Sequence, residues 1–176
     1  VQYHIVFTGT GRNPKIARVE IIARDREHDL AILKLPSPLT PLTLSSPKYV
    51  EDGTEVLLTG FPIGAVLGLY PATHRGIIAA TTPDVIPTQH SSQLSMNILD
   101  RLDKKFMIYQ LDITAYPGNS GSPLYDAQSG EVVGILNKVF VKESKETVLE
   151  KPSGISYAIP VKYLVELAKS KGLKVN

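Results

Sequence analysis

The segment Gly118-Asn119-Ser120-Gly121-Ser122-Pro123-Leu124 is the most informative stretch of this 176-residue chain. A serine hydroxyl becomes a nucleophile only where a base takes its proton and nearby N–H groups stabilise the developing oxyanion. Glycines on both sides of Ser120 permit a tight turn whose backbone N–H groups converge on one hollow. A Gly- and Ser-rich hairpin turn is the alternative interpretation. The segment alone therefore predicts either a nucleophile or a plain turn.

The sequence around this segment alternates short apolar runs with Gly- and Pro-rich breaks. Residues 17–21 alternate apolar and polar side chains with the period of two that is typical of a half-buried strand. Strands at such short spacing favour an antiparallel barrel or sandwich. The runs expected to form strands are Val1–Phe7, Ile16–Arg24, Leu30–Leu35, Glu55–Phe61, Val66–Tyr70, Arg75–Thr81, Phe106–Ile113, Glu131–Val141 and Ile155–Ile159.

Only the C-terminal segment has a clear helical pattern. Apolar residues recur after Pro160 at the i, i+3, i+4 and i+7 positions of one helix face, which predicts a helix with Pro160 at its first position. Gly172 is suited to the left-handed residue that closes such a helix. The polar residues 83–105 show no clear period, and we expect a long surface loop there, with a short helix over Ser91–Leu102 as an alternative.

Composition excludes several classes of protein. The chain has no cysteine, which excludes disulfides, thiolate nucleophiles and cysteine-ligated metal sites. Nineteen Lys and Arg against 17 Asp and Glu give a net charge of +2, with no basic run, so a nucleic-acid partner is not expected. No apolar stretch approaches the ~18 residues of a membrane span. The first residue is Val1 rather than Met, so we expect a processed or truncated product.

Residues 112–136 resemble the serine-site region of trypsin-like, chymotrypsin-fold proteases, and in particular the HtrA/Deg-like bacterial branch. The resemblance covers nearly all of the chain, because three further segments match in the order that the family requires. His28–Leu35 resembles the segment that supplies the triad aspartate, Gly60–Gly64 with Arg75–Ala79 resembles the next hairpin, and Gly154–Pro160 resembles the end of the protease domain.

The resemblance implies an all-β fold of two antiparallel six-stranded barrels with a C-terminal helix. The first barrel is expected to be truncated at its N-terminus and to occupy residues 1–60 of a single protease domain. The second barrel is expected over about residues 61–159, and the helix over about residues 160–171. Relatives in this branch often add a peptide-binding PDZ module after the helix, and none is expected before the chain ends at Asn176.

The same resemblance assigns roles residue by residue. Ser120 is implied as the nucleophile and Asp29 as the residue that orients a histidine base. The backbone N–H groups of Gly118 and Ser120 are implied as the oxyanion hole. The order Asp29 then Ser120 agrees with the His–Asp–Ser order of the chymotrypsin group. The implied substrate-binding residues are Thr114, Ile135, Leu136 and Asn137.

Two further residues bear on specificity and activation. A neutral Thr114 at the base of the pocket argues against Arg or Lys substrates, so we expect a small or medium aliphatic residue before the scissile bond. Asn119 stands where zymogen-type trypsins carry an aspartate that pairs with a newly freed amino terminus. The resemblance therefore argues against activation by N-terminal cleavage.

The histidine base is the open point, because none of the four histidines fits the family pattern fully. His28 adjoins Asp29 and on a strand would point to the opposite face, so we expect a surface histidine. His74, near the rim of the second half, and His90, in the solvated loop, follow the aspartate and so break the family order. The alternatives are His4, or a histidine that lies upstream of the chain or is absent.

The sequence thus predicts a serine endopeptidase that acts on polypeptides and needs no metal or organic cofactor. A non-catalytic pseudoprotease or truncated fragment that binds extended peptides through residues 135–137 is the alternative. An esterase is disfavoured, because the Gly-x-Ser-x-Gly elbow is absent. The resemblance implies a periplasmic or secreted location and leaves the natural substrate and any oligomer open.

Overall fold

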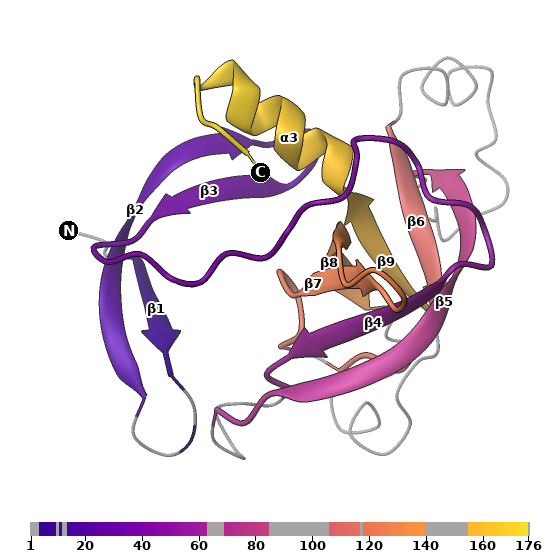
Figure 1. Cartoon of the computed structure of the whole chain (residues 1–176), viewed down its shortest axis with the longest axis horizontal. Helices are drawn as coiled ribbons and strands as arrows, with labels where there is room; N and C mark the ends of the chain where they lie inside the picture. The colour runs from indigo at the N-terminus through magenta and orange to yellow at the C-terminus, as the bar shows by residue number, and fades with distance from the viewer. Residues whose placement is uncertain are drawn as a thin grey trace, which may run out of the picture.

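The computed structural model describes residues 4–9, 11, 14–62, 69–84, 106–116, 118–139 and 155–175. These residues form nine strands and one helix, divided between a three-stranded sheet, a closed barrel and the helix beside them (Figure 1). The prediction of a β protein with a C-terminal helix is therefore confirmed.

The N-terminal sheet is antiparallel in the order β1–β2–β3. Its strands are β1 (His4–Thr8), β2 (Lys15–Asp25) and β3 (Leu30–Lys34). Burial alternates along β2, as the period of two predicts, and a bulge between Ile21 and Ala23 interrupts its ladder to β3. Among the described residues, β1 and β3 pair only with β2, so both outer edges of this sheet lack a further strand.

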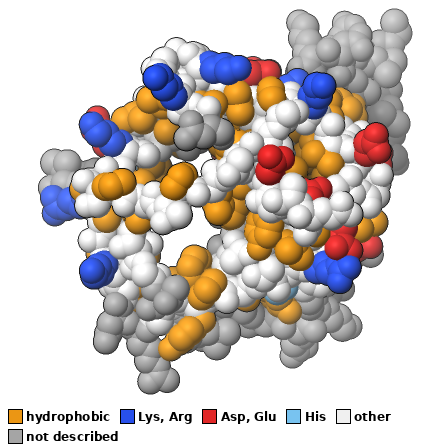
Figure 2. Space-filling model, in the orientation of Figure 1, with side chains coloured by type: hydrophobic (Ala, Val, Ile, Leu, Met, Phe, Trp, Pro, Cys, Tyr) orange, Lys and Arg blue, Asp and Glu red, His pale blue; other side chains and the backbone are white. Residues whose placement is uncertain are grey.

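Apolar side chains are exposed on this sheet. Phe7 and Ile16 face each other across the β1–β2 ladder and are 53% and 63% exposed. Figure 2 shows the surface hollowed between the sheet and the barrel. The buried residues of the sheet, Ala23 and Leu30, pack in one cluster with residues of the helix and the barrel. The sheet therefore depends on the rest of the molecule for its core.

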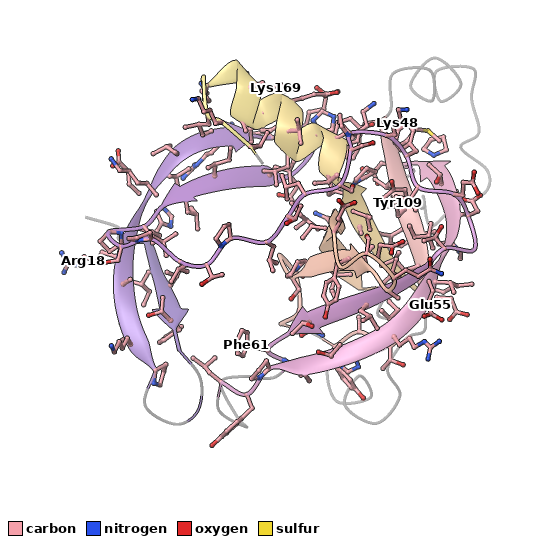
Figure 3. All side chains as sticks on the ribbon, in the orientation of Figure 1. Arg18, Lys48, Glu55, Phe61, Tyr109 and Lys169 are labelled. Carbon is pink, nitrogen blue, oxygen red and sulfur yellow. The ribbon has the colours of Figure 1, made fainter. Side chains whose placement is uncertain are left out.

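The barrel closes in the order β4–β5–β6–β9–β8–β7, with β7 paired back onto β4. Its strands are β4 (Glu55–Gly60), β5 (Ala72–Pro83), β6 (Met107–Asp112), β7 (Pro123–Asp126), β8 (Val132–Val139) and β9 (Ile155–Pro160). Alternate residues point inward, so that Val56 and Leu58 of β4 are fully buried. The ring of Tyr109 is also fully buried, and its hydroxyl accepts a hydrogen bond from the Val50 N–H at 2.9 Å (Figure 3).

The helix α3 (Val161–Ser170) joins the two parts of the fold. Its buried face contributes Tyr163 and Leu167 to the cluster that also holds Ala23 of β2 and Ile108 of β6. As predicted, Gly172 is the left-handed residue that closes the helix, with φ +68°. The N–H groups of Gly172 and Leu173 donate to carbonyls of the last turn at 2.9 and 3.0 Å, which is the Schellman pattern.

The observed elements correct the sequence interpretation at three places. The barrel begins with β4 at Glu55, so the expected boundary near residue 60 lies too late. The strand β7 was not expected. Pro160 caps the helix instead of forming its first turn, because its ψ of 140° is extended. Expectations for residues 66–68, 85–105, which include His90, and 140–141 lie outside the described residues. No helix in the described part is long and apolar enough to cross a bilayer.

Candidate active site

Ser120 lies exposed in a tight loop at one end of the barrel, immediately before β7. Gly118 and Gly121 on its two sides have φ +99° and +86°, a region that favours glycine. Gly121 donates its N–H to the Leu136 carbonyl at 2.7 Å, and Leu136 donates to the Ser122 carbonyl at 2.9 Å. The loop is therefore held on β8. Its two glycines adopt the positive φ angles that a tight turn needs, as the sequence suggested.

Asn119, the residue before Ser120, is the buried residue of this loop. Its side chain is fully buried, and neither its Oδ1 nor its Nδ2 has a hydrogen-bond partner among the described residues. Gly60 at the end of β4 packs against it: a Cβ on Gly60 would lie 2.4 Å from Ser122 Oγ and 2.8 Å from Asn119 Oδ1. Only glycine leaves room for the loop at this point. Phe61, the next residue, extends toward the space between the barrel and the N-terminal sheet (Figure 3).

Asp29 reaches the same region from the other part of the fold. It closes the turn between β2 and β3 with φ +53°, an unusual value for a residue other than glycine. Its Oδ2 accepts a hydrogen bond from Asn137 Nδ2 at 2.7 Å. Asn137 follows Leu136, whose backbone holds the loop after Ser120. The structure thus brings Asp29 and the serine loop to the same strand, β8.

The histidines are placed differently from Asp29. His4 pairs with Val19, six residues before the end of β2, so about 20 Å of strand separates it from the turn that carries Asp29. His74 lies on β5, with its ring 5.7 Å from that of Tyr116. Its Nε2 is buried and has no partner among the described residues. Among the described residues, neither histidine forms a hydrogen bond or ion pair with Asp29 or Ser120.

His28 is not the surface histidine that the sequence suggested. Its side chain is only 15% exposed, and its Nδ1 lies 2.6 Å from Asp25 Oδ2. Its ring is stacked on that of Tyr163 at 4.1 Å. The expectation was wrong because the turn after β2 folds back against α3, a contact that no local pattern reveals.

The substrate-binding candidates divide into two groups. Thr114 is exposed, and Asn137 is half-buried with its side-chain amide bonded to Asp29. Ile135 is also half-buried and packs against the cluster that holds Ala23 and Tyr163. Leu136 is 1% exposed and belongs to the barrel core. Both of its backbone polar groups are engaged by Gly121 and Ser122. Leu136 therefore supports the serine loop and offers no free group to an extended substrate.

The chain is similar to known proteins. A sequence model described as the trypsin-like peptidase domain matches residues 3–135, which include Asp29 and the serine loop. The chain belongs to this family.

Similar members of the trypsin-like peptidase family include bacterial proteases. A probable periplasmic serine endoprotease, DegP-like, from Halomonas elongata is 29% identical over 86% of this chain and 27% of its own length. The serine protease PepD of Mycobacterium tuberculosis is 27% identical over 88% of this chain and 31% of its own length. The solved HtrA-type protease AlgW, bound to a decapeptide, is 30% identical with a TM-score of 0.65, over 89% of this chain and 41% of that one. The chain therefore spans between a quarter and a third of the length of these curated relatives.

Proposed function

We propose that this trypsin-like peptidase domain is the catalytic part of a serine endopeptidase, with Ser120 as the nucleophile. The Ser120 Oγ attacks the scissile carbonyl as a histidine removes its proton, and the N–H groups of Gly118 and Ser120 stabilise the oxyanion. The histidine then protonates the leaving amine, and water hydrolyses the acyl-enzyme. The carrying observation is the bond between Asp29 and Asn137, which holds an acidic side chain on the strand that supports the serine loop.

The base in this proposal is a histidine from outside the described residues. His4 is separated from Asp29 along β2, and His28 is held by Asp25 and Tyr163. His74 belongs to the barrel wall beside Tyr116. Asp29 retains one carboxylate oxygen, Oδ1, to receive the N–H of an incoming imidazole, because Asn137 occupies Oδ2.

The proposed substrates are polypeptides with a small or medium aliphatic residue before the scissile bond. Thr114 supports this preference, because a neutral hydroxyl offers no charge to pair with Arg or Lys. The structure of the HtrA-type relative holds a decapeptide, which supports a polypeptide ligand here as well. Cleavage of a peptide library dominated by Arg or Lys at that position would contradict the preference. Relatives named as periplasmic support a periplasmic or secreted location.

Fluorophosphonate labelling followed by intact mass tests the nucleophile. We expect one adduct on Ser120 in the intact natural protein, its loss in Ser120→Ala, and its retention in Ser129→Ala, a matched change in an exposed turn. Labelling of the 176-residue chain itself would place the base within it and return His4 to consideration. Peptide binding without labelling of the intact protein would favour the pseudoprotease.

A further inference from the structure

The turn that precedes Asp29 is built on one carboxylate. Asp25 Oδ1 accepts the N–H groups of Glu27 and His28 at 3.0 and 3.1 Å, and Asp25 Oδ2 lies 2.6 Å from His28 Nδ1. Partial burial raises the pKa of the Asp25 carboxyl, but the hydrogen bonds and charge of His28 outweigh it and hold the pKa below its usual value. The carboxylate therefore fixes both the backbone and the ring of His28.

The His28 ring is held in turn by the other part of the fold. It is stacked on Tyr163 of α3 with an interplanar angle of 20° and a centroid distance of 4.1 Å. The Phe106 ring, just before β6, meets it edge-on at 4.6 Å. Tyr163 is itself fixed, because its hydroxyl accepts the Met107 N–H at 3.1 Å and lies 2.9 Å from the Tyr49 hydroxyl.

Asp29 directly follows this fixed ring and has a conformation that needs support. A residue other than glycine persists at φ +53° only where its surroundings over-determine it. The surroundings here are the Asp25 bonds on one side and the Asn137 bond on the other. Since β3 begins immediately after Asp29, the turn has no other freedom to absorb a displaced His28.

We propose that His28, fixed by Asp25 and stacked on Tyr163, is a positioning residue that holds the Asp29 carboxylate against Asn137. The inference rests on the proposed function for the catalytic meaning of Asp29, but its geometric content does not. The contacts of His28 with Tyr163 of α3 and with Phe106, just before β6, attach the turn that carries Asp29 to the other part of the fold.

The Asn137 side-chain amide reports this geometry by NMR without any turnover. In the unaltered chain we expect its Nδ2 protons to exchange with water more slowly than those of an amide without a hydrogen bond. In His28→Leu and in Tyr163→Leu the exchange should rise by about tenfold or more, because the amide loses a bond to a charged group. Tyr163→Phe is the matched control, since it removes the hydroxyl bonds to Met107 and Tyr49 but keeps the ring under His28.

The control separates positioning from general stability. The proposal is supported if Tyr163→Phe destabilises the fold but leaves the exchange rate of the Asn137 amide protons unchanged, while Tyr163→Leu raises that rate. Slow exchange that persists in both folded leucine variants overturns it. If either leucine variant fails to fold, Asp25→Asn replaces it, because an asparagine still accepts the two backbone N–H groups but weakens the bond to His28. Unchanged exchange in Asp25→Asn then overturns the proposal. Failure of the proposed function is distinct, because it appears as absent labelling of Ser120 in the unaltered intact protein.

Discussion

Asn137 and Asp29 are separated by 108 residues in sequence, yet Asn137 Nδ2 lies 2.7 Å from Asp29 Oδ2. The bond joins the turn of the N-terminal sheet to the strand that holds the serine loop. In the proposed mechanism Asp29 orients the base for Ser120, and one side-chain amide therefore fixes this acid relative to the serine loop.

We expect Asn137→Ala to reduce the rate of Ser120 acylation by about tenfold or more, because the Asp29 carboxylate loses a fixed orientation. The free energy of unfolding should fall by less than about 1 kcal/mol, since the hydrogen bond is exposed to solvent. Acylation kinetics and urea denaturation measure the two effects. Gln128→Ala, in an exposed turn, is the control and should change neither. An unchanged acylation rate in Asn137→Ala would remove this role.

Gly60→Ala should destabilise the barrel and disturb the serine loop together. The new Cβ would lie 2.4 Å from Ser122 Oγ and 2.8 Å from Asn119 Oδ1, so the loop must shift. Overpacking of this kind costs about 1–3 kcal/mol. Gly53→Ala is the comparison, because its φ of +88° causes strain without crowding. Only the Gly60 variant should slow fluorophosphonate labelling of Ser120; equal labelling in both would contradict the packing argument.

The buried side chain of Asn119 predicts a pH-dependent defect in Asn119→Asp. An ionised carboxylate there has no partner among the described residues, so we expect a loss of about 3 kcal/mol or more at pH 7. Burial would raise the pKa of the new carboxyl, and stability should recover as the pH falls and the group is protonated. Asn119→Leu introduces a side chain of similar volume without a charge, so its free energy of unfolding should stay close to that of the unaltered chain. Urea denaturation between pH 5 and 8 decides, and a flat difference would refute the burial of the charge.

The alkaline limb of the stability curve should depend on Tyr163. Burial, followed by the contact with the Tyr49 hydroxyl, raises the pKa of Tyr163 to about 12. The unfolded chain loses this proton near pH 10, so the stabilisation is complete below pH 10 and is lost as the pH rises through about 12.

Tyr163→Phe removes that titration. Between pH 10 and 12 the free energy of unfolding of the variant should therefore fall less steeply, by up to about 1.4 kcal/mol per pH unit. Urea denaturation at several pH values above 9 provides the measurement. Tyr109, whose pKa burial also raises, continues to titrate in the variant and serves as an internal reference. Parallel stability curves for the two proteins would contradict the assignment.

The sequence allowed most of the fold to be predicted, because local periodicity marks a strand that has one face in a core. It failed where the deciding contact is distant. The strand β7 is short and begins with Pro123, so its register against β4 and β8 exists only in the closed barrel. Alternation could not show that Leu136 would be a core residue.

The site was predictable to the same extent. The glycines around Ser120 are visible in the sequence, since a tight turn depends on neighbouring residues, whereas the role of Asp29 was expected only from the family resemblance. The hydrogen bond from Asn137 to Asp29 and the stacking of His28 on Tyr163 are not visible, because each joins segments that only the folded chain brings together.

The strand that closes the barrel begins just after the proposed nucleophile. Its pairing of Val56 with Asp126 joins distant parts of the sequence, and such pairings form late in folding. Until they form, Gly60 does not pack against Asn119 and Ser122, and the serine loop lacks this packing contact. A chain still emerging from the ribosome therefore carries every residue of the loop without the packing that holds it in place, and the proposed site would assemble only when the barrel closes.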